Sequence, residues 1–251
     1  MKLPTLRGVI DRRILANYRI DPEVLAQVLP PPFRPKLISG CGIGGICLIR
    51  LRGIRPRFFP SFLGFSSENA AHRFAVQWED RGQVHEGVYV PRRDTSSRVN
   101  ALVGGRVFPG VHHLASFDVR ETEESFAVAL NSVDDATHVR VEGCLESELP
   151  SSSIFSSLTE ASDFFEAGSL GYSATARKGV FDGIELHVPV WVTEPLDVTR
   201  VESSYFEDRG RFPAGSTEFD CALLMRDIRH EWFAREELSA AANESSPSVP
   251  R

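Results

Sequence analysis

Short segments in which apolar and polar residues alternate follow one another along most of this chain. Alternation with a period of two is typical of β-strands that are buried on one face. The run Gly42 to Arg55 is the longest of them, and its early glycines indicate a bend or a close backbone approach. The expected strands are 9–20, 42–55, 70–79, 84–91, 111–120, 126–132, 138–145, a segment near Ser173, 184–192, 198–206 and 221–233.

Three short helices interrupt this pattern. Asp21-Pro22 begins the first, because Asp is a good cap and Pro suits the first helical position. Residues 94–103 predict a second helix, capped by Asp94 or Thr95, and residues 157–167 predict a third, closed by Gly168. Asp182-Gly183 predicts a turn. Many strands with few helices predict an α+β, mainly β fold built on a large curved sheet.

Length and composition place the chain among single globular domains. It has 251 residues, 42% of them apolar and 25% charged, and no internal repeat or linker divides it. We expect one domain over 1–235 and a disordered tail over 236–251, which is rich in Ser, Pro and Asn. A net charge of -6 gives no general attraction to nucleic acid or to a membrane surface.

The four cysteines form no CxxC pair and no zinc spacing, so we expect free thiols in a reducing compartment. The N-terminal residues contain no apolar core of a signal peptide, and no apolar run could span a bilayer. The expected localisation is therefore cytoplasmic. The sequence lacks the phosphate-binding and dinucleotide-binding glycine motifs, and we expect no cofactor.

The segment Ser66 to Arg73 contains the first candidate site. Glu68 and His72 share one face of an extended chain, and Asn69 and Arg73 share the other. A Glu beside a His in a cavity can act as an acid or a base. The alternative is a structural ion pair between Glu68 and an arginine at the start of a strand.

The segment Arg92-Arg93-Asp94, at a strand end before a predicted helix, is the second candidate. Helix N-termini and arginines both bind anions. Arg92 and Arg93 point to opposite faces of a strand, so at most one can face a pocket. The alternative is a capped helix with solvated arginines.

Histidine and lysine add two weaker candidates. His112 and His113 are adjacent on a strand and face opposite ways, so we expect no metal site there. Lys178 lies beside Arg177, whose charge could lower an amine pKa, although a solvated turn lysine is the simpler interpretation.

In this order the segments resemble the acetoacetate decarboxylase-like superfamily, and more closely an uncharacterised bacterial branch of it that is a domain of unknown function. The match covers nearly all of 7–232. The segments that carry it are Asn17-Tyr18-Arg19, 29–33 (LPPPF), 66–73 (SSENAAHR), 91–98 (PRRDTSSR), 104–110 (GGRVFPG), 164–173 (FFEAGSLGYS), Met225-Arg226 and His230-Glu231-Trp232.

The resemblance implies an α+β, mainly β fold whose curved sheet closes into a cone-like β-barrel around a small polar cavity. Glu68 falls at the position of the family's catalytic Glu, and Arg106 at that of a Gly-Arg pair. The reactive lysine of the family falls at Gly110, beside Val111, and neither has an amine. The chain therefore lacks the Schiff-base lysine, and imine-dependent decarboxylation cannot be carried over.

We accordingly expect an enzyme that acts on a small oxo- or carboxylated metabolite by acid/base chemistry, as a lyase, hydratase or isomerase. The alternative is a non-catalytic metabolite-binding or regulatory module that uses the same pocket. The ligand should be anionic, with no nucleic acid or membrane partner, and assembly into a homo-oligomer is left open. The expected catalytic residues are Glu68 and His72, and the expected substrate-binding residues are Arg92, Arg93, Asp94, Arg106 and His112.

Overall fold

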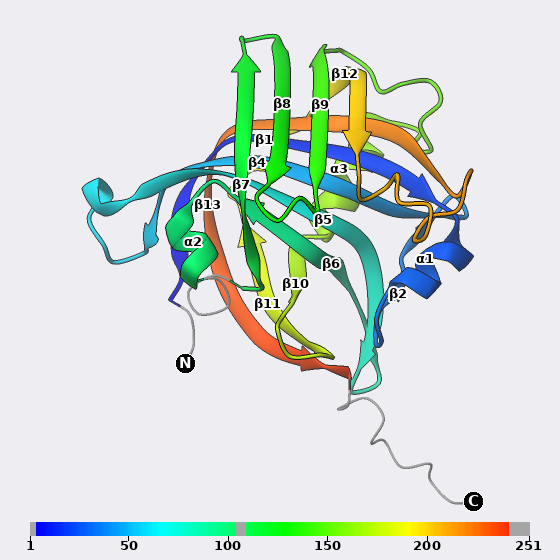
Figure 1. The fold of residues 1–251 in the computed structure, drawn as a ribbon, viewed down its shortest axis with the longest axis horizontal. Coiled ribbons are helices and arrows are strands. Elements are labelled where there is room, and N and C mark those ends of the chain that lie inside the picture. Colours follow the sequence, from blue (N-terminus) through cyan, green and yellow to red (C-terminus); the bar gives the residue numbers. More distant parts are fainter. Residues whose placement is uncertain (1–3, 104–108, 241–251) are drawn as a thin grey trace, which may run out of the picture.

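The computed structural model describes residues 4–103 and 109–240, and strands dominate it (Figure 1). The helices are α1 (Pro22–Val28), the 3₁₀ helix η1 (Ser61–Leu63), α2 (Arg98–Val103) and α3 (Leu158–Ala167). The strands are β1 (Leu6–Ile20), β2 (Arg34–Pro35), β3 (Leu37–Ile38), β4 (Cys41–Pro56), β5 (Phe65–Asp80), β6 (Gln83–Thr95), β7 (His112–Glu121), β8 (Ser125–Ser132), β9 (His138–Leu145), β10 (Leu170–Ala174), β11 (Val180–His187), β12 (Glu194–Ser203) and β13 (Thr217–Ser239).

Most predicted elements are present. Asp21 caps α1 by accepting hydrogen bonds from the backbone N–H groups of Glu23 and Val24, and Ser157 caps α3 in the same way through Glu160. The last strand runs to Ser239, beyond the expected domain end at 235. Of the expected tail over 236–251, residues 236–239 belong to β13 and 241–251 lie outside the described residues. No helix of the described residues is long and apolar enough to cross a membrane.

Two predictions of local structure are wrong. Asp94 and Thr95 belong to β6, and the helix begins only at Arg98, because the pairing of β6 with β5 and β7 continues to Thr95. Ser97 instead accepts a hydrogen bond from the backbone N–H of Asn100 at 3.2 Å. Asp182-Gly183 is part of β11 rather than a turn, since both residues pair with β10.

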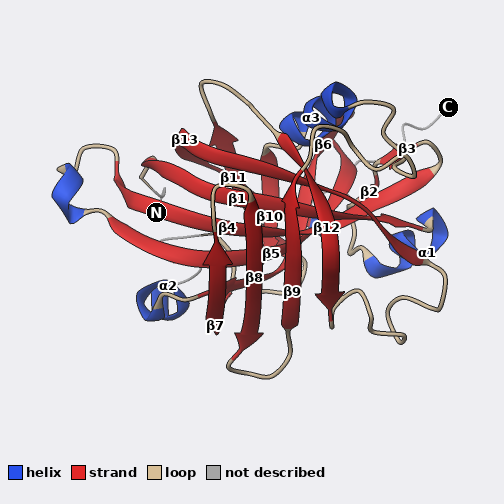
Figure 2. Ribbon diagram, turned by 90° about the horizontal axis from the view of Figure 1, so that it is seen from above, coloured by secondary structure: helices blue, strands red, loops and turns tan. Residues whose placement is uncertain are grey.

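The sheet closes into a ring. Long strands β13, β1, β4, β5 and β6 form a central wall in that order, and β10 and β11 close it by pairing with β6 and β13 respectively. Strands β7, β8, β9 and β12 connect β6 to β13 over the opposite face of the wall. Figures 1 and 2 show these four strands crossing the long strands on one side of the wall, while β10 and β11 lie on the other.

The central wall therefore has two buried faces, and each carries its own hydrophobic cluster. Ile14, Phe74 and Val128 belong to a core cluster on the face that packs against β7, β8 and β9. The opposite face carries a second cluster that contains Leu15 and Cys47, and α3 packs there through Ala161 and Phe165. Because side chains alternate along a strand, a shift of one residue decides which face a side chain reaches.

Candidate functional site

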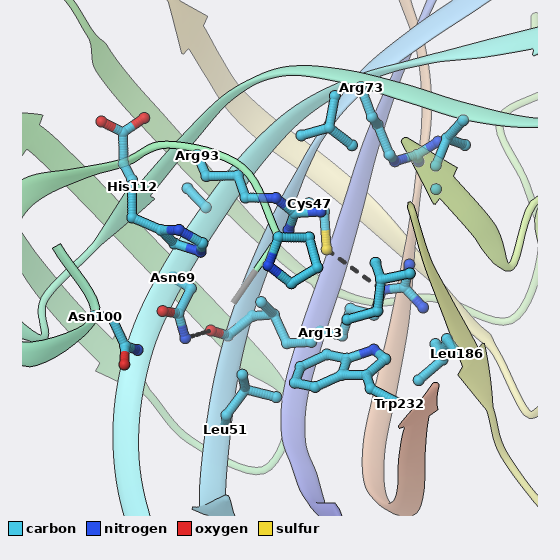
Figure 3. Close-up of a pocket in the computed structure, with 18 of the residues that line it drawn as sticks. Arg13, Cys47, Leu51, Asn69, Arg73, Arg93, Asn100, His112, Leu186 and Trp232 are labelled. Atoms are coloured by element: carbon cyan, nitrogen blue, oxygen red, sulfur yellow. Dashed lines mark hydrogen bonds between the residues drawn. The ribbon is translucent and has the colours of Figure 1, made fainter. Parts of the chain in front are cut away.

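A cavity of about 130 Å³ lies on the α3 side of the central wall, inside the ring (Figure 3). Strands β1, β4, β5, β6, β7, β11 and β13 all contribute side chains to it. Its polar lining residues are Arg13, Cys47, Asn69, Arg73, Arg93, Asp94, Asn100, His112 and Ser169. Its larger apolar lining residues are Ile49, Leu51, Ile54, Phe65, Val88, Val90, Ile184, Leu186 and Trp232.

Strand register brings three arginines to this cavity. Leu15 pairs with Cys47, Cys47 with Ala71, and Ala71 with Arg93, so these positions share one face across four strands. Arg13 and Arg73 each lie two residues from that row on their own strands and therefore point the same way. Cys47 is the thiol at the centre of this arrangement.

The contacts of the Arg13 guanidinium among the described residues are with two sulfur atoms and an aromatic ring. Its Nε donates to the Cys47 sulfur at 3.3 Å and its Nη1 to the Met225 sulfur at 3.7 Å. Its guanidinium lies over the Trp191 ring at 5.4 Å from the centroid. Within the described part of the chain, no carboxylate forms an ion pair with it.

Arg73 is 4% exposed. Its Nη2 donates to the Asn17 side-chain oxygen at 2.5 Å, its guanidinium lies over the Phe165 ring, and its Nε has no partner among the described residues. Burial lowers the pKa of Arg73 to about 10, and nearby Arg13 acts in the same direction. Arg73 is therefore a buried cation that has no counter-ion within 4–103 and 109–240.

Arg93 is the third arginine of the cavity. Of the neighbours Arg92 and Arg93, it is Arg93 whose side chain faces the cavity. Its Nε donates to the Ser173 hydroxyl at 2.9 Å, and burial lowers its pKa to about 10. Arg92 points the other way and forms ion pairs with Asp94 and with Asp134 in the turn between β8 and β9. Three guanidinium groups without a described ion pair thus line one cavity, an arrangement that favours an anionic ligand.

His112 and Asp94 also line the cavity. The His112 Nδ1 lies 3.2 Å from the Gly110 carbonyl oxygen, which assigns the proton to Nδ1 and leaves Nε2 as an acceptor. Burial, with the charge of Arg93, lowers the pKa of His112 to about 3, so its ring is neutral at pH 7. Burial raises the pKa of Asp94, although its hydrogen bonds with Arg92 oppose that shift.

Glu68 does not line the cavity, contrary to the placement expected from the sequence. It lies on the opposite face of β5, directly across from Arg50 in the register, which in turn pairs with Arg12. Its carboxylate accepts 2.5 Å hydrogen bonds from Arg12 Nη2 and Arg50 Nε. Glu121 of β7 contacts both arginines. This is the structural ion pair that the sequence left open as the alternative.

His72 is buried on the same face as Glu68, outside the cavity. Its ring stacks on Tyr205 with centroids 4.5 Å apart, and its Nε2 lies 3.5 Å from the Ser203 hydroxyl. Burial, with the charges of Arg92 and Arg211, lowers its pKa to about 3. The structure therefore separates the Glu68 and His72 pair from the cavity, because the whole thickness of the wall lies between them.

The remaining candidates have simple outcomes. Arg106 lies outside the described residues. Lys178 is exposed in the turn between β10 and β11 and does not line the cavity. Lys36 pairs with Glu86 at 2.6 Å and reaches an adjoining hollow of about 30 Å³, which Arg13 and Arg73 also line. Among the described residues, no cluster of His, Cys, Asp and Glu could hold a metal ion.

Sequence reasoning missed Arg13, Cys47 and Asn100 as site residues. Arg13 lies in a segment whose alternation is loose, and Cys47 reads as a small core residue. The signal that could have found Arg13 is the register of three neighbouring strands, which a single sequence does not contain. Asn69 and Arg73 were placed together on one face, and that face is the one that lines the cavity.

Comparison with known proteins gives a family and a fold. A family model matches residues 10–221; its family, DUF2071, is described as an uncharacterized conserved protein. A search of curated proteins found no match. The structure of acetoacetate decarboxylase from Legionella pneumophila subsp. pneumophila str. Philadelphia 1 superimposes with a TM-score of 0.61 at 12% identity, covering 94% of this chain and 88% of that chain.

Two further structures are similar. An acetoacetate decarboxylase-like enzyme from Sphingomonas wittichii RW1 gives a TM-score of 0.56 at 10% identity and covers 95% of this chain and 92% of its own. The enduracididine biosynthesis enzyme MppR, complexed with pyruvate, gives 0.58 at 10% identity and covers 96% and 91% respectively. Identities this low establish the fold and nothing finer.

Proposed function

Because the chain belongs to the DUF2071 family and has the acetoacetate decarboxylase-like fold, we propose that it is an enzyme acting on a small oxo acid anion. The reaction is acid/base chemistry next to the carbonyl group, without an imine, as in a lyase, hydratase or isomerase. The arginines of the cavity bind the substrate, and Glu68 and His72 have structural roles on the other face of the wall.

One observation carries this proposal: Arg13, Arg73 and Arg93 line one cavity, and none of them forms an ion pair with a carboxylate of the described residues. Burying a charge without a partner costs several kcal/mol of desolvation free energy. The attraction of an oppositely charged group can offset this cost. A bound carboxylate would supply the missing negative charge and could accept paired hydrogen bonds from a guanidinium. The site is thus complementary to a small anion.

The number of cations supports catalysis as well as binding. One carboxylate needs one or two guanidinium groups, so a third can face the carbonyl oxygen of an oxo acid. When a proton leaves the carbon beside that carbonyl, negative charge develops on the oxygen. Positive groups already fixed there stabilise the transition state more than the ground state.

His112 is the cavity residue best suited to move the proton. Its Nε2 would accept the proton as the carbon–hydrogen bond breaks, and the electron pair would pass to the carbonyl oxygen as an enolate. A histidine pKa of about 3 makes a weak base in the empty cavity. Burial is the main cause of this low pKa, and the charge of Arg93 adds to it. A substrate anion beside Arg93 would offset the second contribution and so raise the pKa.

The family's imine chemistry has no group to carry it in the described cavity. Neither Lys36 nor Lys178 lines it, and Lys2 lies outside the described residues. Gly110, where the resemblance places the reactive lysine, has φ +79°, and an added Cβ would lie 2.5 Å from the Ser173 Cβ. A side chain at this position would be strained. The pyruvate named in the MppR complex supports an oxo acid as the ligand class.

The test is a panel of 2- and 3-oxo acids, incubated in deuterium oxide with the protein and followed by proton NMR. Exchange at the carbon beside the carbonyl reports proton transfer whatever the final reaction is. We expect exchange with at least one acid, lost in His112→Asn and in Arg93→Ala. Arg120→Ala, at an exposed arginine of β7, is the matched control and should exchange normally.

Binding measured by calorimetry separates the two function classes. An acid that binds but never exchanges would overturn the enzyme and support the non-catalytic receptor. Failure of every acid to bind would overturn both, because the arginine cavity is common to them.

A further inference from the structure

The cavity is polar at one end and apolar at the other. Figure 3 shows Arg73, Arg93 and Cys47 at one end and Leu51, Leu186 and Trp232 at the opposite end. The apolar end continues into a hydrophobic cluster that includes Leu51, Ile54 and Met225, with Leu186 and Trp232 packed against it. A ligand that fills the cavity must therefore match two different environments.

The most exposed large apolar side chain of the described lining belongs to the apolar end. Phe65, the first residue of β5, lines the cavity and is 38% exposed, whereas Arg73 is 4% exposed. The hairpin before Phe65 continues this apolar surface with Phe62 and Leu63, which are 81% and 53% exposed. A ligand that enters beside Phe65 reaches the arginines with its charged end first.

We infer that the ligand is an amphipathic anion: a 2-oxo acid with an alkyl or aryl side chain. This inference rests on the proposed function, because it takes the arginine cavity as the substrate site. The carboxylate and carbonyl lie against Arg13, Arg73 and Arg93, and the side chain lies between Leu51, Phe65 and Trp232.

Size agrees with this assignment. The cavity volume is about 130 Å³. In another protein an apolar cavity of about 150 Å³ holds one benzene molecule, which has six heavy atoms. The oxo acid head and the first side-chain carbons fill such a space, and the remainder of a branched or aromatic side chain extends to the mouth at Phe65.

The three arginines by themselves would also fit a dicarboxylate. A second carboxylate would then have to lie among the uncharged side chains of Leu51, Leu186 and Trp232. Of the three arginines only Arg13 contacts the cluster behind them, through the sulfur of Met225. An unpaired carboxylate in such surroundings is strongly unfavourable. The apolar end therefore selects against a second charge.

The experiment compares pyruvate, 4-methyl-2-oxopentanoate, phenylpyruvate and 2-oxoglutarate by calorimetry. Burial of several carbons should make the two apolar acids bind at least about tenfold more tightly than pyruvate. 2-Oxoglutarate should bind no more tightly than pyruvate. Phe65→Ser should lower the affinity for phenylpyruvate about fivefold more than that for pyruvate. Phe62→Ser, at a more exposed phenylalanine that does not line the cavity, is the matched control.

Equal affinity for all four acids, or a preference for 2-oxoglutarate, would overturn the inference and leave the oxo acid site standing. Absence of binding by every acid would instead overturn the proposed function. Equal losses in Phe65→Ser and Phe62→Ser would show that the side chain of the ligand does not lie at the mouth.

Discussion

Arg13 donates a hydrogen bond from Nε to the sulfur of Cys47 over 3.3 Å, inside the cavity that also holds Arg73 and Arg93. The alkylation rate of the Cys47 thiol therefore depends on the concentration of anionic reagent that the arginines attract into the cavity. Cys144 of β9 is exposed and lies outside this cavity, so the chain contains its own reference thiol.

We therefore predict that Cys47 prefers an anionic alkylating agent. The ratio of the iodoacetate rate to the iodoacetamide rate should be at least about tenfold higher at Cys47 than at Cys144, since positive charge raises the local concentration of anions. Peptide mass spectrometry at short times measures both sites in one sample. Arg93→Ala should reduce the ratio at Cys47 only. The same ratio at both cysteines would contradict an anion-binding cavity.

Glu68 should matter for stability and not for ligand binding. Glu68→Gln leaves Arg12, which is 2% exposed, with only the more distant Glu121 carboxylate, at 3.5 Å, as a charged partner. Loss of a partner from a largely buried pair should lower the free energy of unfolding by about 2–3 kcal/mol, measured by urea denaturation. Glu202→Gln, in an exposed pair with Arg200, is the control and should cost less than about 1 kcal/mol.

The affinity of Glu68→Gln for the best oxo acid should equal that of the unaltered protein. A large loss of affinity with unchanged stability would return Glu68 to the chemistry and contradict its structural role.

The sequence pattern predicts most of the strands and helices, but it does not predict which face of each strand lines the cavity. The alternation of residues 9–20 and the cap at Asp21 predict β1 and α1 because both signals are local. Asp94 looks like a helix cap, yet pairing with neighbouring strands keeps it in β6. Such pairing joins residues far apart in the chain, and a single sequence carries no record of it.

The same limit explains the outcome at the candidate site. The sequence correctly puts Glu68 and His72 on one face and Asn69 and Arg73 on the other. It does not say which face meets the cavity, because the wall is buried on both sides and both faces carry polar residues. The arginines reach the cavity through register, not through any local motif.

Three histidines with lowered pKa values, two of them buried, predict a loss of stability in mild acid. Burial lowers the pKa of His72 and of His112 from 6.5 to about 3, and that of His230 to about 4. Between about pH 6.5 and 4 the unfolded chain therefore binds protons that the folded protein does not. The free energy of unfolding should fall as the pH drops through this window, by up to about 1.4 kcal/mol per pH unit for each histidine.

Urea denaturation at several pH values between 7.5 and 5 measures this slope. His72→Phe keeps a ring to stack on Tyr205 and should reduce the slope by about one histidine's share. His85→Gln, at an exposed histidine of β6, should leave it unchanged. A slope that is the same in all three proteins would contradict the assignment of a buried, neutral His72.

A crystal structure of the protein soaked with 4-methyl-2-oxopentanoate tests the central claim most directly. The account predicts that the carboxylate lies within about 3 Å of the guanidinium groups of at least two of Arg13, Arg73 and Arg93. The branched carbons should lie beside Leu51 and Trp232. Ligand bound beside Glu68 on the other face of the wall, with the arginine cavity empty, would contradict it.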